Sequence, residues 1–126
     1  MTEIDPASTA LVLVDFQERI VAMPTTPFAG PEAAANAVRL RDAFSEAGLH
    51  THLRDAGVRT VVFGGIATEF GVESTLRAAA DHGYAVIGVS DAMTGLSDVS
   101  HESSTTKIFQ RLGTVLTTAE TLAALR

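Results

Sequence analysis

The sequence predicts an α/β fold in which a parallel sheet is covered by helices on both faces. Apolar runs suited to strands, such as Ala10–Val14 and Val58–Phe63, alternate with segments whose apolar residues recur at helical spacing. Runs rich in β-branched residues are typical of strands that are buried on both faces. This alternation predicts three layers with right-handed crossovers between parallel strands.

The first third of the chain predicts one strand and one helix. The run Ala10–Val14 predicts a buried strand that delivers Asp15 to its carboxyl end. A proline-containing loop follows, and Pro31 suits the first turn of the next helix. We expect Gly48 to end that helix. Its core face contains Ala37, Leu40, Phe44 and Ala47.

The middle of the chain predicts a strand, a glycine-rich turn and a helix. The strand is Val58–Phe63, and the turn that follows reads Gly64–Gly71, which we call the glycine bend. Thr68 is expected to be the N-cap of the helix, which ends near Gly83. A bend of this kind brings backbone N–H groups and the positive end of a helix dipole to one point, where an oxyanion, carboxylate or phosphate can bind.

The last third predicts two strands and two helices. Residues 84–89 form the next buried strand, which ends in Ser90–Asp91, and residues 114–116 form a short one. A helix over 98–112 is weakened by a cluster of serine and threonine residues. Thr117 and Glu120 form a capping box that opens a final helix, with Leu122 and Leu125 facing inward.

One junction interrupts the alternation. Residues 47–51 and 56–60 repeat the same pattern of a helix end followed by a strand start, only nine residues apart. A crossover between parallel strands needs roughly 30 residues or more in a βαβ unit, so the space is too short for one. A short irregular connection is one interpretation, and the alternative that we favour is a deletion at 49–57. The whole chain, 1–126, is then a single domain with a core of about 8–118.

Composition restricts the partners and the chemistry. Nine basic and fifteen acidic residues give a net charge of −6, which argues against nucleic acid or an anionic membrane as partner. The chain has no cysteine, hence no disulfide, thiolate nucleophile or cysteine-ligated metal of its own. No signal peptide or membrane-spanning run is evident, so we expect a cytoplasmic protein. Nothing in the sequence requires a cofactor.

Three segments resemble the isochorismatase-like hydrolases, or cysteine hydrolase superfamily. They are Thr9–Gln17, Val61–Thr75 and Gly83–Met93, and the second is the most specific. The resemblance implies a Rossmann-like parallel sheet with strand order 3-2-1-4-5-6. The region that supplies strands 2 and 3 is absent here, so the chain is expected to keep about four strands in the order 1-4-5-6 of the family numbering.

The resemblance also implies a site. The family uses an aspartate after strand 1, a lysine after strand 2 and a cysteine at the start of the helix after strand 4. Asp15 matches the aspartate and Gly71 occupies the place of the cysteine, whereas the only lysine, Lys107, lies elsewhere. A non-proline cis peptide is implied at Ile66–Ala67, where backbone N–H groups face the developing oxyanion. The implied substrate-binding residues are Gln17, Ile66, Ala67 and Thr68.

Each candidate residue also has a purely structural interpretation. Asp15 is a general base or a carboxylate that caps a turn, and Gln17 binds substrate or is a solvated loop residue. The pair His50 and His52 lacks a carboxylate partner, which favours surface residues over metal ligands, so no metal site is expected. Glu69 and Glu73 favour the helix dipole, and Asp91 is expected to fix the loop after its strand.

Two functions remain open at the level of sequence. One is a hydrolase that acts on a small molecule by Asp15-assisted, cysteine-independent hydrolysis; some isochorismatases also have glycine at the nucleophile position and cleave a vinyl ether by protonation and water addition. The loss of the lysine predicts impaired activity. The other is a non-catalytic remnant that binds a small anion or serves as an oligomer subunit. The exposed apolar edge of strand Ala10–Val14 favours a homo-oligomer.

Overall fold

The computed structural model of the chain describes residues 3–14, 24–46 and 57–125, with the side chains of helix α2 described up to Arg41. Several sequence predictions fall outside these residues. They are the helix stop at Gly48, the deletion at 49–57 and the histidines His50 and His52. In the described part of the chain, no helix is long and apolar enough to cross a membrane.

A four-stranded parallel sheet forms the centre of the molecule. Its strands are β1 (Thr9–Val14), β2 (Thr60–Ile66), β3 (Ala85–Thr94) and β4 (Thr114–Leu116). They lie in the order β1-β2-β3-β4, and every neighbouring pair is parallel. The predicted sheet of four strands in the reduced family order is confirmed.

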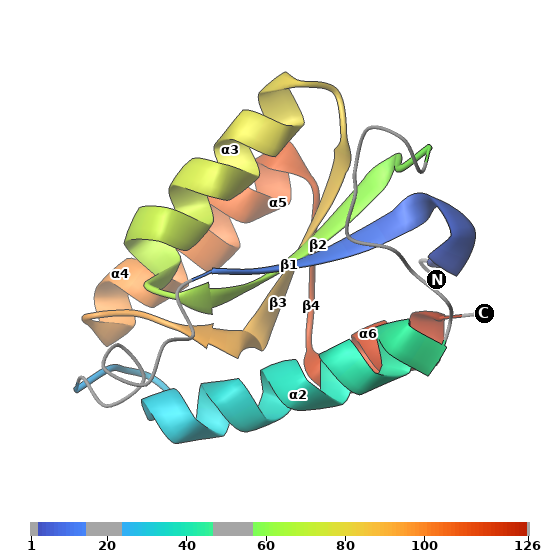
Figure 1. Cartoon of the computed structure of the whole chain (residues 1–126). Coiled ribbons are helices and arrows are strands. Elements are labelled where there is room, and N and C mark those ends of the chain that lie inside the picture. Colours follow the sequence, from blue (N-terminus) through green and yellow to red (C-terminus); the bar gives the residue numbers. More distant parts are fainter. Residues whose placement is uncertain (1–2, 15–23, 47–56, 126) are drawn as a thin grey trace.

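Helices cover both faces of this sheet (Figure 1). Helix α2 (Gly30–Glu46) and helix α6 (Thr118–Ala124) lie on one face. Helices α3 (Glu73–Asp81) and α5 (Phe109–Leu112) lie on the other. The predicted three-layer α/β architecture is therefore confirmed, and Pro31 occupies the first turn of α2 as expected.

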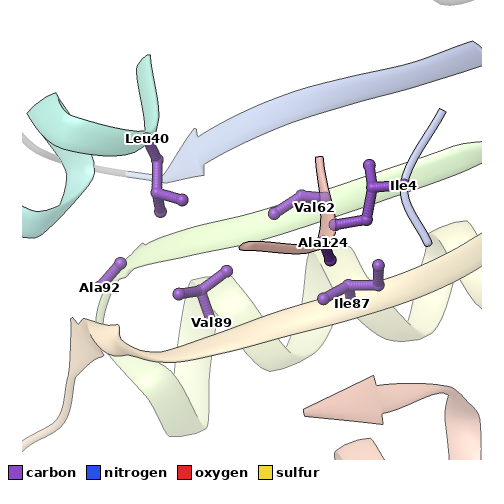
Figure 2. Packing of buried hydrophobic residues seen from close by; sticks show 7 residues of the cluster. All are labelled: Ile4, Leu40, Val62, Ile87, Val89, Ala92 and Ala124. Carbon is purple, nitrogen blue, oxygen red and sulfur yellow. The ribbon is translucent and has the colours of Figure 1, made fainter. Parts of the chain in front are cut away.

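Each face of the sheet has its own apolar core. Figure 2 shows the core beneath α2 and α6, where Leu40 and Ala124 lie over Val62 and Val89. On the other face, Val61 and Phe63 pack with Leu76 and Phe109 of the opposite helices. Neighbouring residues of β2 enter different cores because successive side chains of a strand point to opposite faces. Burial on both faces explains the β-branched composition of β2.

The helix predicted over 98–112 forms as three connected pieces. Helix α4 (Asp98–Ser103) leads into a π-helical segment, η3 (Ser104–Ile108), which continues into α5. The hydroxyl of Thr105 donates to the carbonyl of His101 at 3.0 Å, and that of Thr106 donates to the carbonyl of Glu102 at 2.6 Å. Hydroxyl groups that compete for helix carbonyls weaken regular α-helical pairing, and the change of helix type falls within this cluster.

The strand predicted over 84–89 is longer than expected. Strand β3 continues to Thr94, and a register irregularity between Phe63 and Gly65 allows Met93 to pair with Gly65. Asp91 therefore lies inside a strand, and the prediction that it fixes a following loop is wrong. Its carboxylate instead accepts hydrogen bonds from the backbone N–H and hydroxyl of Thr118, at 2.7 and 2.6 Å, and so holds the first turn of α6.

The predicted start of the last helix is confirmed. Thr117 Oγ1 accepts from the Glu120 backbone N–H, and the Glu120 carboxylate accepts from the Thr117 N–H. Leu122 and Leu125 are half-buried against the core of the α2 face.

Candidate active site

The end of β1 lies directly against the glycine bend. Val14, the last residue of β1, pairs with Gly65, and Gly65 has a φ of +136°. A Cβ atom at Gly65 would lie 2.7 Å from the backbone nitrogen of Val14 and closer still to its carbonyl oxygen. Only glycine allows this approach, because any side chain would overlap the neighbouring strand. The chain thus leaves β1 at the same edge of the sheet where the bend begins.

The bend contains a non-proline cis peptide between Ile66 and Ala67. This is the bond at which the family resemblance implied one, and that expectation is confirmed. The residues after it form a π-helical turn, η2 (Thr68–Val72), which leads into α3. The carbonyl of Ala67 accepts hydrogen bonds from the amides of Phe70 and Val72, at 3.1 and 3.2 Å. These two amides are therefore used within the turn.

Thr68 does not cap the helix. Ala67 is the N-cap residue, and no side chain accepts a capping hydrogen bond there. Thr68 is fully buried, and its Oγ1 lies 2.7 Å from Nδ1 of His101 in helix α4. The N-cap prediction is wrong because a partner 33 positions away in the chain takes the hydroxyl that a local pattern assigns to the helix amides.

His101 is a buried histidine, and its burial favours the neutral form of the imidazole ring. Its side chain is 6% exposed, and the ring packs edge-on against Phe28, with centroids 6.0 Å apart. Burial lowers the pKa of the His101 imidazole below its usual value of 6.5, although the carboxylates of Glu69 and Asp98 act in the opposite direction. Desolvation disfavours the charged form of a histidine.

Further hydrogen bonds join the segments around the bend, and one set of them reaches the bend itself. The proline segment, residues 24–28, is joined to the end of β3. The Phe28 amide donates to Thr94 Oγ1 at 3.1 Å. Thr26 and Gly95 exchange two backbone hydrogen bonds, both at 2.8 Å. The Glu69 carboxylate accepts from the Leu96 amide, with both oxygens at 3.2 Å. Glu69 therefore connects the bend to the chain after β3, in addition to its favourable place in the first helical turn.

The structure describes only some of the predicted catalytic and substrate-binding residues. Gly71 is half-buried in η2, and its carbonyl accepts from the hydroxyl of Thr75 at 2.7 Å. Asp15 and Gln17 lie outside the described residues. Lys107 is exposed in η3, beside a groove lined with Val99, Glu102, Ser103 and Thr106. The structure thus brings Ile66, Ala67, Thr68 and Gly71 together in one turn.

No cluster of three or more potential ligands from His, Cys, Asp and Glu gathers within the part of the chain that the structure describes. Among the described residues, the candidate site therefore consists of the backbone of the bend and the residues that support it.

His101 contacts the bend and Phe28 contacts His101, and sequence reasoning assigned neither residue to the candidate site. A signal for His101 was present in the helix predicted over 98–112. His101, Thr105 and Phe109 recur at intervals of four, and all three are buried. This spacing marks the inner face of a helix. For Phe28 the sequence carries no comparable signal, because its contact with His101 joins segments that are distant in the chain.

The sheet and the bend define an α/β domain with its candidate crevice at the carboxyl ends of the strands, where doubly wound sheets bind their ligands. A sequence model of the isochorismatase domain matches residues 41–120. The isochorismatase family protein YwoC of Bacillus subtilis is 46% identical over 80 residues, which are 64% of this chain and 42% of that protein. The chain therefore belongs to the isochorismatase family.

Solved structures share this fold. An isochorismatase family protein from Burkholderia thailandensis superposes with a TM-score of 0.89 at 25% identity, covering 98% of this chain and 97% of that one. The Escherichia coli YcaC gene product, an octameric hydrolase of unknown specificity, superposes with a TM-score of 0.82 at 18% identity, covering 99% and 82%. The chain spans less than half the length of the curated relative YwoC.

Proposed function

We propose that the chain is a hydrolase domain that acts on a small molecule by Asp15-assisted, cysteine-independent hydrolysis, with activity below that of relatives that keep the lysine. The observation that carries this proposal is the pairing of Val14 with Gly65. Asp15 follows Val14 directly in the sequence, and Val14 lies beside the bend. A proton donor next to a group of backbone amides is the arrangement that such hydrolysis needs.

The roles follow from the chemistry of each group. Asp15 in its protonated form transfers a proton to the terminal methylene carbon of the vinyl ether. Water then adds to the oxygen-bearing oxocarbenium carbon, and the Asp15 carboxylate takes a proton from that water. The adduct collapses to a ketone and an alcohol. The backbone of Ile66, Ala67 and Thr68 binds a substrate carboxylate or oxyanion, and Gln17 donates a hydrogen bond to the substrate. Gly71 leaves open the space that a cysteine side chain fills in thiol-dependent relatives.

The test is turnover of isochorismate and of simple amides by the wild type and by Asp15→Asn. We expect measurable release of product from isochorismate, none from amides, and a loss of about 100-fold or more in Asp15→Asn, the range for removal of a general acid or base. Asp81→Asn, an exposed carboxylate at the end of α3, is the matched control and should keep wild-type activity. Equal activity of Asp15→Asn and the wild type would refute the proposal.

A second candidate function is assembly, in which the chain acts as a homo-oligomer subunit and binds at most a small anion. Residues Leu11–Val14 of β1 are only half-buried, and Leu13 borders a largely apolar groove that is also lined with Ala34, Ala37, Val38 and Arg41. Val38 is 43% exposed. Among the described strands, β1 pairs only with β2, and an unpaired strand edge favours pairing with another copy. The YcaC gene product, which has this fold, is octameric, and this supports the proposal.

Light scattering tests this second function. We expect the wild type to form a dimer or a larger assembly, and Leu13→Lys to lower its mass. Val99→Lys, at a position 78% exposed on helix α4, is the control and should leave the mass unchanged. A wild type that stays monomeric at high concentration would contradict the assembly role and leave the hydrolase proposal intact.

A further inference from the structure

Thr68 and His101 form a buried hydrogen-bonded pair that joins the glycine bend to helix α4. Thr68 follows the cis peptide between Ile66 and Ala67, and it is fully buried. His101 belongs to helix α4, and its ring contacts Phe28 of the proline segment. One imidazole ring therefore contacts two segments that are 40 residues apart in the chain.

We propose that His101 is a positioning residue for the site: its neutral ring holds the bend through the Thr68 hydroxyl, and protonation of the ring loosens the bend and weakens substrate binding. This inference rests on the function proposed above. His101 itself does not reach the reacting atoms in this account. It acts through Thr68, whose backbone is one of the groups that we assign to substrate binding.

The chemistry of the hydrogen bond supports a role for the protonation state. A neutral imidazole can accept at Nδ1 from the Thr68 hydroxyl, since only one of its two nitrogens carries a proton. An imidazolium carries a proton on both nitrogens, so Thr68 would have to become the acceptor and turn its own proton elsewhere. Because Thr68 is fully buried, a hydroxyl proton without a partner is unfavourable there, since no water can replace the lost acceptor.

Two carboxylates act on the His101 ring. Glu69 faces it from η2 and Asp98 from its own helix α4, and both favour the protonated form. The proline segment contributes the uncharged ring of Phe28. Glu69 is held by the Leu96 amide, and burial of His101 outweighs the effect of the two carboxylates. The ring is therefore neutral at neutral pH and becomes charged only under acidic conditions.

A pH titration followed by NMR of the full chain tests the inference without requiring catalysis. We expect the His101 ring to titrate below pH 6.5, and the amide resonances of Ala67, Thr68 and Glu69 to shift with the same midpoint. In Thr68→Ser, which keeps the hydroxyl, this coupling should persist. In Thr68→Val it should disappear, while His101 still titrates.

His82 provides the matched control. It is an exposed histidine at the end of α3, with Nδ1 2.7 Å from the Ala78 carbonyl oxygen. The variant His82→Asn should leave the shifts of the three bend amides unchanged. If those amides do not follow the His101 midpoint in the wild type, or follow it equally in Thr68→Val, the inference is overturned. The wild-type titration decides this even if a variant fails to fold.

Kinetics separates this inference from the function on which it rests. If isochorismate is turned over, KM should rise in the wild type as the pH falls through the His101 midpoint, with a smaller change in kcat. In His101→Asn, whose amide occupies the place of Nδ1 without titrating, that rise in KM should be absent. No turnover at all, with coupled NMR shifts, refutes only the proposed function. Turnover whose KM ignores the His101 midpoint overturns the positioning role alone.

Discussion

Replacing Gly65 with alanine should damage the site by pushing β1 away from the bend. The added Cβ would lie 2.7 Å from the Val14 nitrogen and 2.8 Å from the Val14 Cα, both backbone atoms of the neighbouring strand. Two costs add up at this position. A non-glycine residue at a φ of +136° costs about 1–3 kcal/mol, and an overlap that shifts the backbone costs about 1–3 kcal/mol more. We expect Gly65→Ala to lose about 2–6 kcal/mol of unfolding free energy.

Gly83→Ala separates the two costs. Gly83 also has a positive φ, +89°, but a Cβ there would have no heavy atom within 4 Å. It therefore carries only the conformational cost. For a chain of this length, 1 kcal/mol corresponds to about 4 °C in Tm, because the entropy of unfolding is about 2.1 cal/mol/K per residue. Gly65→Ala should melt about 4–12 °C below Gly83→Ala, as measured by circular dichroism. Equal melting temperatures would show that β1 does not pack against Gly65 as described.

Three further predictions concern stability and are measured by urea unfolding. Asp91→Ala should lose about 2–4 kcal/mol, because the buried amide and hydroxyl of Thr118 lose a charged acceptor; a loss below about 1 kcal/mol would contradict this. Leu40→Ala, fully buried, should lose about 2–5 kcal/mol, whereas Val38→Ala, 43% exposed, should lose about 1 kcal/mol or less. Because the pKa of His101 is lowered in the folded state, the unfolded chain binds more protons just below pH 6.5, so the unfolding free energy should fall as the pH decreases through 6.5. His101→Asn should lack this part of the pH dependence, and a variant with the same dependence as the wild type would refute it.

The architecture was predictable because it depends on patterns that are local in the sequence. The β-branched run before the bend predicted a strand with two buried faces, and Val61 and Val62 indeed enter different cores. Caps are equally local, and the box formed by Thr117 and Glu120 needs only residues three positions apart. The family resemblance added the strand order, which periodicity alone does not give.

The details that were missed depend on contacts between distant segments. The length of β3 depends on the register irregularity beside Gly65, which belongs to another strand. The hydroxyl of Thr68 satisfies the rule for an N-cap in the sequence, yet His101 competes for it successfully in the folded chain. Asp91 resembles a residue of a loop after a strand, but its partner Thr118 lies 27 positions away. A local pattern indicates that a polar side chain makes a hydrogen bond, but it does not determine the partner.

The same distinction applies to the proposed site, which lacks two side chains that the family resemblance implies. The bend is built from backbone approach at Gly65, from the buried pair of Thr68 and His101, and from the bond between Glu69 and the Leu96 amide. None of these supports uses Gly71. On the proposed assignment, in which Gly71 stands where the family resemblance implies a cysteine, the missing side chain removes thiol chemistry and leaves these contacts in place. The bend therefore keeps its geometry without a side chain at residue 71, and the proposed function assigns anion binding to its backbone alone.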